Sequence, residues 1–512
     1  MGDEPIIVAD TAHGPARIFA AGLATGTALL AIAVFCAVNG YGGLALMVLI
    51  AAAIGLGLVY RSMPASVPRL PSFHRTSPTP DRDAFRTGAA ALIDAARRRR
   101  KVPTLLRLDI DRVRAISGPQ GREAHDLALR HVAALLDDEL PRSALVARLE
   151  GDRFAAVMAF APGDAARVER IVDRLAVRLV QPIRRDGMEV QASVTFGLAR
   201  DTGQESLDTL LRQADMALTA SAQGTRGQPW FTPEIERALG ERAAFVAALR
   251  AGIERGEIVP HFDPQVDLGN GRLVGFEVLA RWHHPERGIL PAREFLAIAE
   301  ETGLICDLSL AVMRQAFAAA RDWDPSLKLA INLSATQFQD AWLAQKIIKI
   351  LTETGFPAHR VEVEITERAL LADLPLAQSI VASLKNQGIG LALDDFGTGY
   401  SSLAHLRALP FDRIKIDRTY VQAMGADAER AAIVQAIVQL GDSLNLPTTA
   451  EGVTDADLAE RLRTLGCVQA QGTLYGEPMA LPDIRRLLAE RHLLSRAVVT
   501  PGSGLTSPRL AG

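Results

Sequence analysis

Cysteine is scarce in this chain of 512 residues, and the three that occur, Cys36, Cys306 and Cys467, lie far apart. No two of them have the close spacing of zinc ligands, so we expect ordinary buried thiols in a reducing compartment. An excess of positive charge is also missing, since the formal net charge is −3. This balance gives no general attraction for a polymer of phosphates, and we expect no nucleic-acid polymer as a partner.

Charge of either sign is absent from one long stretch. Residues 18–60 contain no Asp, Glu, Lys or Arg, and a spanning helix needs about 20 apolar residues. The stretch predicts a membrane hairpin with a turn at residues 39–43, because a cleaved signal peptide has a shorter apolar core. Arg17, Arg61 and Arg69 flank it, so the positive-inside rule predicts a multi-pass protein of the cytoplasmic membrane with both chain ends in the cytoplasm.

The remainder divides by composition and by alternating strand and helix patterns. The later half repeats short apolar strands and helices over roughly 250 residues, which is typical of a closed α/β barrel with its site at the carboxyl ends of the strands. We therefore expect a cytoplasmic N-terminal tail (1–17), two transmembrane helices (18–60), a Pro-rich linker (61–82), a first α/β domain (83–233), a TIM-like (β/α)8 barrel (241–495) and a disordered tail (496–512).

The most specific pattern of the chain is LALDDFGTGYSSL, residues 391–403. Two adjacent acids, Asp394 and Asp395, follow a short apolar strand, and Gly397 and Gly399 follow the acids. Adjacent carboxylates repel each other unless a cation lies between them, and the glycines let the backbone bend sharply. The pattern predicts a divalent-metal site beneath a mobile loop.

Other polar residues fall at the ends of predicted strands in the same half of the chain. In a barrel these ends converge on one mouth, and oxygen ligands of this kind suit Mg²⁺ or Mn²⁺. Each alone is a weak signal, but together they predict one site. The residues are Glu277, Asn332, Glu364, Lys415, Asp417, Glu451 and Gln471.

With these motifs in place, residues from about 245 to 490 resemble an EAL domain, the bacterial family that hydrolyses cyclic di-GMP. The Glu-Ala-Leu signature stands here as Glu277-Val278-Leu279, and INLS, EITE, DDFGTGYSSL, IKID, AEGV and QG occur in family order. One departure lies in the first strand, where the family usually has Tyr-Gln-Pro and this chain has Phe262-Asp263-Pro264.

The resemblance implies a role for each matching residue at a centre of two Mg²⁺ or Mn²⁺ ions. Lys415 would contact the attacking water or a phosphate, and Glu451 would serve the metal site or act as general base. Gln471 would support the water network, and Glu367 would brace the loop. Arg281 and Leu279 would contact the substrate. The implied metal ligands are Glu277, Asn332, Glu364 and Asp394 for one ion and Asp395 for the other, with Asp417 as a further candidate.

Residues from about 83 to 232 resemble a GGDEF domain, the family that condenses two GTP molecules into cyclic di-GMP. The signature reads Glu150-Gly151-Asp152-Arg153-Phe154. Glu150 places an anion where the backbone approaches a triphosphate, and Arg153 replaces an acid. Asp109 and Asp152, the implied metal ligands, are retained. The pattern predicts a degenerate domain without cyclase activity.

Other positions of this domain point the same way. Asp126 is retained at a guanine-reading position, but its companion Asn is replaced by Ser117. A phosphate-binding Lys is replaced by Ala222, and the inhibitory RxxD motif lacks its acid at Ala144. Two interpretations stay open: the domain binds GTP without turnover, or it is a structural and dimerising module without nucleotide.

The leading hypothesis is therefore a membrane-anchored cyclic di-GMP phosphodiesterase of the bacterial inner membrane that forms linear pGpG and acts as a homodimer. The alternative is a receptor that binds cyclic di-GMP without hydrolysis and signals through the hairpin. The metal-site acids and the lysine are present, which favours the enzyme. A bifunctional cyclase–hydrolase is disfavoured by Glu150 and Arg153.

Overall fold

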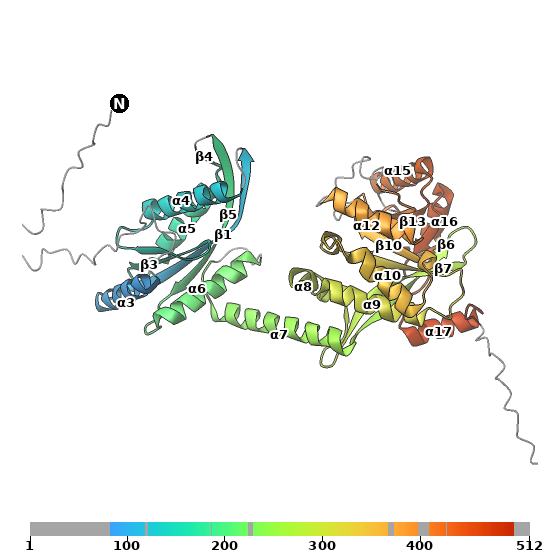
Figure 1. Ribbon diagram of the computed structural model, residues 1–512, viewed down its shortest axis with the longest axis horizontal. Helices are drawn as coiled ribbons and strands as arrows, with labels where there is room; N and C mark the ends of the chain where they lie inside the picture. Colours follow the sequence, from blue (N-terminus) through green and yellow to red (C-terminus); the bar gives the residue numbers. More distant parts are fainter. Residues whose placement is uncertain are drawn as a thin grey trace, which may run out of the picture. The chain divides into compact units, whose positions relative to one another are not determined.

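The computed structural model describes residues 82–117, 121–185, 187–223, 229–366, 373–397, 409–425 and 427–495 (Figure 1). The chain forms two compact units, residues 1–239 and 240–512. Each unit has hydrophobic clusters built from its own residues.

The first unit is a five-stranded sheet in the order β2-β3-β1-β5-β4, and every neighbouring pair is antiparallel. This agrees with the expected α/β domain. The strands are β1 (Val102–Ser117), β2 (Leu145–Glu150), β3 (Arg153–Phe160), β4 (Ile183–Arg185) and β5 (Met188–Arg200).

Helices cover both faces of this sheet, because successive side chains of a strand point to opposite faces. Leu106 and Leu108 of β1 pack in the cluster that contains α4 and α5, whereas Leu105 packs with α3 and α6. The helices are α3 (Arg82–Arg98), α4 (Arg122–Glu139), α5 (Ala165–Val180) and α6 (Leu207–Ala222).

The second unit is a closed eight-stranded barrel, as the sequence predicts. Its strands follow the order β6-β14-β13-β12-β11-β10-β9-β7, and a β6–β7 pairing closes the ring. β6 is antiparallel to both of its neighbours, β7 and β14, while the other ring pairs are parallel. The strands are β6 (Ile258–Asp267), β7 (Leu273–His284), β9 (Lys328–Leu333), β10 (Val361–Thr366), β11 (Gly390–Phe396), β12 (Arg413–Ile416), β13 (Thr448–Ala450) and β14 (Gln469–Gln471), with β8 (Gly288–Pro291) paired to the outer part of β7.

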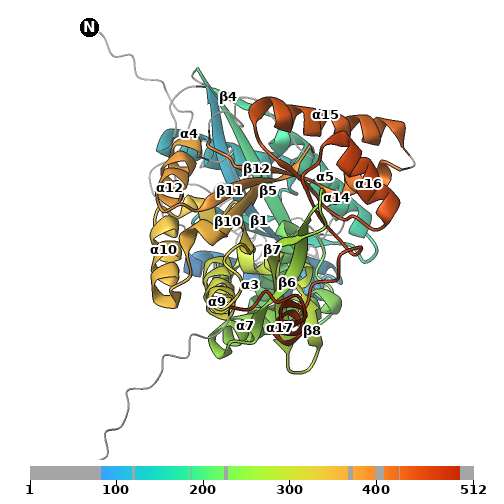
Figure 2. The ribbon, with the colours of Figure 1, turned by 90° about the vertical axis from the view of Figure 1, so that its right-hand side faces the viewer.

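Helices surround the barrel strands (Figure 2). The outward-facing side chains of the strands form the hydrophobic core between the barrel and its helices. Phe262 and Phe276, for example, contact Trp323 edge to face. The helices are α7 (Pro233–Arg255), which contains the boundary between the units, then α8 (Leu296–Glu301), α9 (Ile305–Ala319), α10 (Leu343–Thr354), α12 (Leu374–Asn386), α14 (Arg418–Ala423), α15 (Ala428–Leu444), α16 (Ala456–Leu465) and α17 (Leu481–Glu490), with short 3-10 turns η1 (Ala292–Glu294), η2 (Gln337–Gln339) and η3 (Ala358–Arg360).

The expected location in a membrane is contradicted. Across the part of the chain that the structure describes, no helix combines the length and the apolar character needed to cross a bilayer. The two transmembrane helices were placed at residues 18–60, which lie outside the described residues, as do the Pro-rich linker up to residue 81 and the tail 496–512. An apolar stretch of sequence is not in itself a spanning helix. The prediction of an inner-membrane protein is therefore corrected.

Candidate functional site

A single buried lysine lies at the centre of the acids predicted from the strand ends. Lys415 of β12 is fully buried, and its Nζ lies 2.7 Å from Glu364 Oε2 and 2.6 Å from Glu451 Oε1. Glu277 Oε2 and Asp394 Oδ1 are 3.4 and 3.5 Å away. Burial alone would lower the pKa of Lys415, but these carboxylates raise it well above its usual value. The lysine is therefore held as a cation.

Glu277 of β7 is held by neighbours on both of its carboxylate oxygens. Asn332 Nδ2 donates to Oε1 at 2.5 Å, and Gln471 Nε2 donates to Oε2 at 2.6 Å. Burial would raise the pKa of Glu277, but Lys415 and the two amide hydrogen bonds keep it below its usual value. Gln265 Nε2 donates in turn to Gln471 Oε1 at 3.0 Å.

Gln265 is a residue that the sequence analysis missed. It lies on β6 two positions after Asp263, on the same face of the strand, and that spacing was the available signal. Its contact to Gln471 fixes which end of that amide faces Glu277, so it positions the site from beneath.

Two buried carboxylate oxygens of the site have no hydrogen-bond partner: Glu364 Oε1 and Asp394 Oδ1. Burial raises the pKa of Glu364 well above its usual value, with Glu277 and Asp394 adding to the effect against the influence of Lys415. A buried anionic oxygen without a donor is costly. Hard oxygen donors in this state fit a divalent cation such as Mg²⁺ or Mn²⁺.

Asp394, Asp395 and Glu451 form an acidic group in which one oxygen of each lies within 4.8 Å of the others. Asp395 has a left-handed backbone with φ 53°, an uncommon conformation for a residue other than glycine that turns the chain at the strand end. Burial, then Asp394 and Asp417, raise the pKa of Asp395. Burial raises the pKa of Glu451 to about 8, with Asp394 and Glu277 adding and Lys415 opposing.

The remaining predicted residues lie around this centre. Asp417 caps α14, its Oδ1 accepting a hydrogen bond from Thr419 N at 2.9 Å. Leu279 and Arg281 follow Glu277 at two-residue spacing on β7, both half-buried. Arg281 Nη1 donates to Ala280 O at 2.9 Å. Glu367, the predicted loop brace, lies outside the described residues.

Glycines shape the backbone beside two site residues. Gly397, after Asp395, has φ +100°, and Tyr420 Oη donates to its carbonyl at 2.6 Å. Gly472, after Gln471, has φ +146°, and a Cβ there would lie 2.3 Å from Val453 N. The predicted sharp bend at Gly397 is confirmed, whereas Gly399 is outside the described residues.

Asp263, the departure noted in the sequence, also lies at this site. The β6–β7 register places it directly opposite Glu277. Its Oδ1 is buried without a hydrogen-bond partner. Burial, together with Glu277, raises the pKa of Asp263 to about 7 in spite of Lys415.

In the first unit, the two retained acids are engaged by basic side chains. Arg153 Nε donates to Asp109 Oδ2 at 2.8 Å, and His125 Nε2 lies 2.7 Å from Asp152 Oδ1. Arg153 is the residue that replaces an acid in the predicted signature. The positive charge of Arg153 thus pairs with Asp109, a carboxylate that the resemblance assigned to a metal ion.

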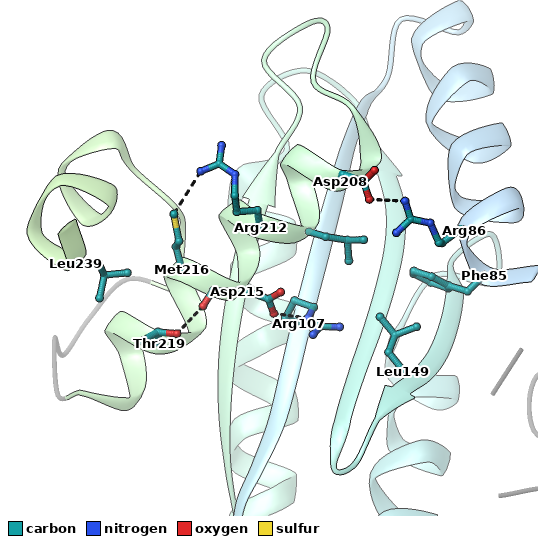
Figure 3. Close-up of a pocket in the computed structure, with 11 residues that line it drawn as sticks. Phe85, Arg86, Arg107, Leu149, Asp208, Arg212, Asp215, Met216, Thr219 and Leu239 are labelled. Carbon is teal, nitrogen blue, oxygen red and sulfur yellow. Dashed lines mark hydrogen bonds and ion pairs between the residues drawn. The ribbon is translucent and has the colours of Figure 1, made fainter. Parts of the chain in front are cut away.

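A separate cavity of about 420 Å³ lies in the same unit and is lined by residues of α3, β1, β2 and α6 and by Leu239 of α7 (Figure 3). Arg107 Nε donates to Asp215 Oδ1 at 2.6 Å inside it, and Arg86 pairs with Asp208 at 2.5 Å nearer the solvent. The Arg107–Asp215 pair connects β1 to α6.

The fold and site define a class: a (β/α)8-type barrel whose strand ends carry a lysine-centred carboxylate cluster suited to divalent cations. Family models give the particular families. Residues 246–478 match the EAL domain, and residues 78–228 match "Diguanylate cyclase, GGDEF domain". The chain therefore contains a GGDEF domain followed by an EAL domain.

The chain is similar to curated bacterial proteins over about three quarters of its length. It is 35% identical over 382 residues to the bifunctional diguanylate cyclase/cyclic di-GMP phosphodiesterase MucR of Pseudomonas aeruginosa, covering 73% of this chain and 55% of MucR. It is 34% identical over 378 residues to the cyclic di-GMP phosphodiesterase PdeR of Escherichia coli, covering 73% of this chain and 57% of PdeR. The chain thus spans about half the length of the curated relatives that it matches.

Among solved structures, the EAL enzyme Bd1971 in its cAMP- and cyclic-di-GMP-bound form matches with a TM-score of 0.50. The match covers 76% of this chain and 95% of that chain at 18% sequence identity. A likeness at this identity supports the fold alone.

Proposed function

We propose that the EAL domain of this chain hydrolyses cyclic di-GMP to linear pGpG. The observation that carries the proposal is the set of carboxylates around Lys415 at the barrel mouth, two of which have a buried oxygen that accepts no hydrogen bond. The names of MucR and PdeR, both cyclic di-GMP phosphodiesterases, support the substrate and the reaction.

We propose that the centre holds two Mg²⁺ or Mn²⁺ ions. Bound there, two divalent cations would supply an activated water nucleophile and neutralise the oxygens of an in-line phosphodiester displacement. Glu364 Oε1 and Asp394 Oδ1 are buried and accept no hydrogen bond, which makes these two residues the best supported ligands. The full proposed set is Glu277, Asn332, Glu364 and Asp394 for one ion and Asp395 for the other, with Asp417 as a further candidate.

Lys415 and Glu451 are assigned complementary tasks. Lys415 stays protonated, so it acts as a fixed positive charge at Nζ that binds the scissile phosphate or orients the attacking water. Glu451 lies 2.6 Å from Lys415 Nζ and in one acidic group with Asp394 and Asp395, so its carboxylate is placed to take a proton from that water. Gln471, held by Gln265, fixes the orientation of Glu277.

Substrate binding is assigned to residues further out along β7. Arg281 is half-buried above Glu277 and presents a permanent positive charge, which suits the second phosphate of a cyclic dinucleotide. Leu279, on the same face of the strand, offers an apolar contact. The proposed active form is a homodimer, which light scattering on the purified chain would test.

We propose further that the GGDEF domain makes no cyclic di-GMP and has a regulatory or structural role. Support comes from Arg153, whose guanidinium pairs with Asp109 at 2.8 Å. Because the Arg153 guanidinium occupies the Asp109 carboxylate, that carboxylate is not available to bind the Mg²⁺ that would hold a triphosphate. Incubation with GTP and Mg²⁺ should yield no cyclic di-GMP, and product formation would contradict this part of the proposal.

Hydrolysis by the purified chain tests the main proposal. Cyclic di-GMP with Mg²⁺ or Mn²⁺ should yield pGpG, and Glu277→Ala should abolish the product. Binding of cyclic di-GMP without turnover would instead identify a receptor. The effect of GTP on the hydrolysis rate separates the two roles left open for the GGDEF domain, since a scaffold without nucleotide leaves the rate unchanged.

A further inference from the structure

The barrel carries one more acid at the level of the metal centre than the family pattern supplies. Asp263 lies on β6 directly opposite Glu277 on β7. Residues opposite each other in an antiparallel pair have Cβ atoms roughly 4.5–5.5 Å apart and point to the same face. Phe262 and Phe276, their neighbours, pack outside against Trp323, so Asp263 and Glu277 both face the barrel interior.

The Asp263 carboxylate has an oxygen that no hydrogen-bond donor contacts, as expected of a metal ligand. Its Oδ1 is buried and accepts no hydrogen bond, which among the carboxylates that the structure describes is shared only by Glu364 Oε1 and Asp394 Oδ1. All three belong to strands of the same barrel mouth. A structural role for Asp263 would require a donor, such as the amides that hold Glu277.

The charge balance of the mouth points in the same direction. Glu277, Glu364, Asp394 and Glu451 already surround Lys415, the one ammonium group among them. A further acid beside Glu277 adds negative charge that Lys415 and Arg281, whose positive charges both act on Asp263, do not fully offset. Burying such an excess is costly unless the acids take up protons or cations enter the site.

We propose that Asp263 is an additional oxygen ligand of the divalent-metal centre, contacting the cation beside Glu277 through Oδ1 and raising the affinity of this chain for Mn²⁺ and Mg²⁺. The inference rests on the metal centre of the proposed function, but not on hydrolysis. An amide at this position could offer only a neutral oxygen, which is a weaker partner for a hard cation than a carboxylate.

The experiment is a calorimetric titration of Mn²⁺ alone into the divalent-free full-length chain and into its Asp263→Asn and Asp263→Gln variants. Loss of even an outer neighbour of a metal site costs roughly 10–100-fold in affinity. We expect both variants to bind Mn²⁺ at least about tenfold more weakly than the parent chain. Asp263→Asn keeps the side-chain shape, and unchanged circular dichroism would show that both variants fold.

Glu477→Gln is the matched control. Glu477 is exposed, yet its charge is close enough to act on Asp263, so the variant removes the same charge from the same region without removing a buried oxygen. We expect its Mn²⁺ affinity to stay within about threefold of the parent, because exposed charges are screened.

The outcomes separate the two levels of the proposal. Weaker binding in both Asp263 variants but not in Glu477→Gln supports ligation by Asp263. Equal or tighter Mn²⁺ binding in Asp263→Asn overturns it, as does an equal loss in the Glu477→Gln control, which would show a general effect of charge. Failure of the parent chain to bind Mn²⁺ would overturn the metal centre itself.

Discussion

At the scale of single residues, the site consists of one lysine that several carboxylates share. Lys415 contacts acids that come from β7, β10, β11 and the end of β13, so no single neighbour determines its charge. Glu364 Oε1 and Asp394 Oδ1 accept no hydrogen bond, because one ammonium group cannot donate to all of these carboxylates. The lysine thus offsets part of the negative charge of these carboxylates and leaves oxygens that could bind cations.

Replacing this lysine tests both of its effects. Lys415→Met removes the fixed charge, and we expect kcat for cyclic di-GMP hydrolysis to fall about 10²- to 10³-fold. Urea unfolding without divalent cations should show a loss of about 3–5 kcal/mol, because the buried acids lose their counter-charge.

Lys385→Met is the control for that substitution. Lys385 pairs with Asp412 near the surface, where side-chain exposures are 27% and 43%. Such a pair contributes at most about 1 kcal/mol, so activity and stability should change little. A Lys415→Met variant with the parent rate would exclude an electrostatic role for this residue.

The raised carboxyl pKa values predict how the stability of the metal-free barrel depends on pH. Asp263 and Glu451 titrate near 7 and 8 when folded and near their usual values of 3.8 and 4.5 when unfolded. Between about pH 6.5 and 8 the folded state therefore binds more protons, and the free energy of unfolding falls as pH rises. Each group contributes at most about 1.4 kcal/mol per pH unit.

Urea unfolding in EDTA from pH 6.5 to 8 measures this slope. The window starts at 6.5 because burial lowers the pKa values of His131 and His261, and these histidines oppose the trend at lower pH. Saturating Mn²⁺ should flatten the slope, since a cation favours the ionised carboxylates. A metal-free stability that rises across this window would contradict the prediction.

At the scale of elements, register and turns decide which side chains meet. β10 pairs with β9 so that Glu364 lies beside Asn332, and β7 pairs with β6 so that Glu277 lies beside Asp263. In the GGDEF domain, the Arg107–Asp215 pair connects a central strand to α6 across the cavity of Figure 3.

That pair makes a prediction for the GGDEF domain. The Arg107 side chain is 8% exposed, so Asp215→Ala leaves a buried guanidinium without its acceptor. We expect the free energy of unfolding of this domain to fall by about 1–3 kcal/mol in urea. Asp208→Ala, which breaks the more exposed pair with Arg86, should cost at most about 1 kcal/mol. Equal effects of the two substitutions would show that the burial of Arg107 does not matter.

At the scale of the whole molecule, the two units have separate hydrophobic clusters and different electrostatic centres. In the barrel, buried acids outnumber the lysine among them, whereas in the GGDEF domain Arg153 already neutralises Asp109. Divalent cations should therefore affect the units differently.

Scanning calorimetry of the full chain tests this difference. We expect two unfolding transitions. Mn²⁺ should raise the midpoint temperature of the barrel transition alone, because a ligand stabilises the unit that binds it. At 100 times its dissociation constant, Mn²⁺ should add about 2.7 kcal/mol to the barrel. Glu277→Ala should remove the shift. A comparable Mn²⁺ shift of the GGDEF transition would contradict the role assigned to Arg153.

The sequence by itself determined the types and order of the main elements and the acids of the barrel mouth. Alternating strand and helix patterns predicted two α/β units, and the motif around Asp394 located the acidic group at the barrel mouth. This was possible because strand and helix periodicity is local, and because parallel strands bring their carboxyl ends together.

Only the tertiary structure decided how these groups share charge and hydrogen bonds. That Arg153 pairs with Asp109, that Gln265 holds Gln471, and that Asp263 faces Glu277 depends on register between strands distant in sequence. The apolar stretch at residues 18–60 lies outside the described residues, and among those described no helix is long and apolar enough to cross a bilayer. Composition reports what a segment could bury, whereas contacts between distant segments determine what each side chain does.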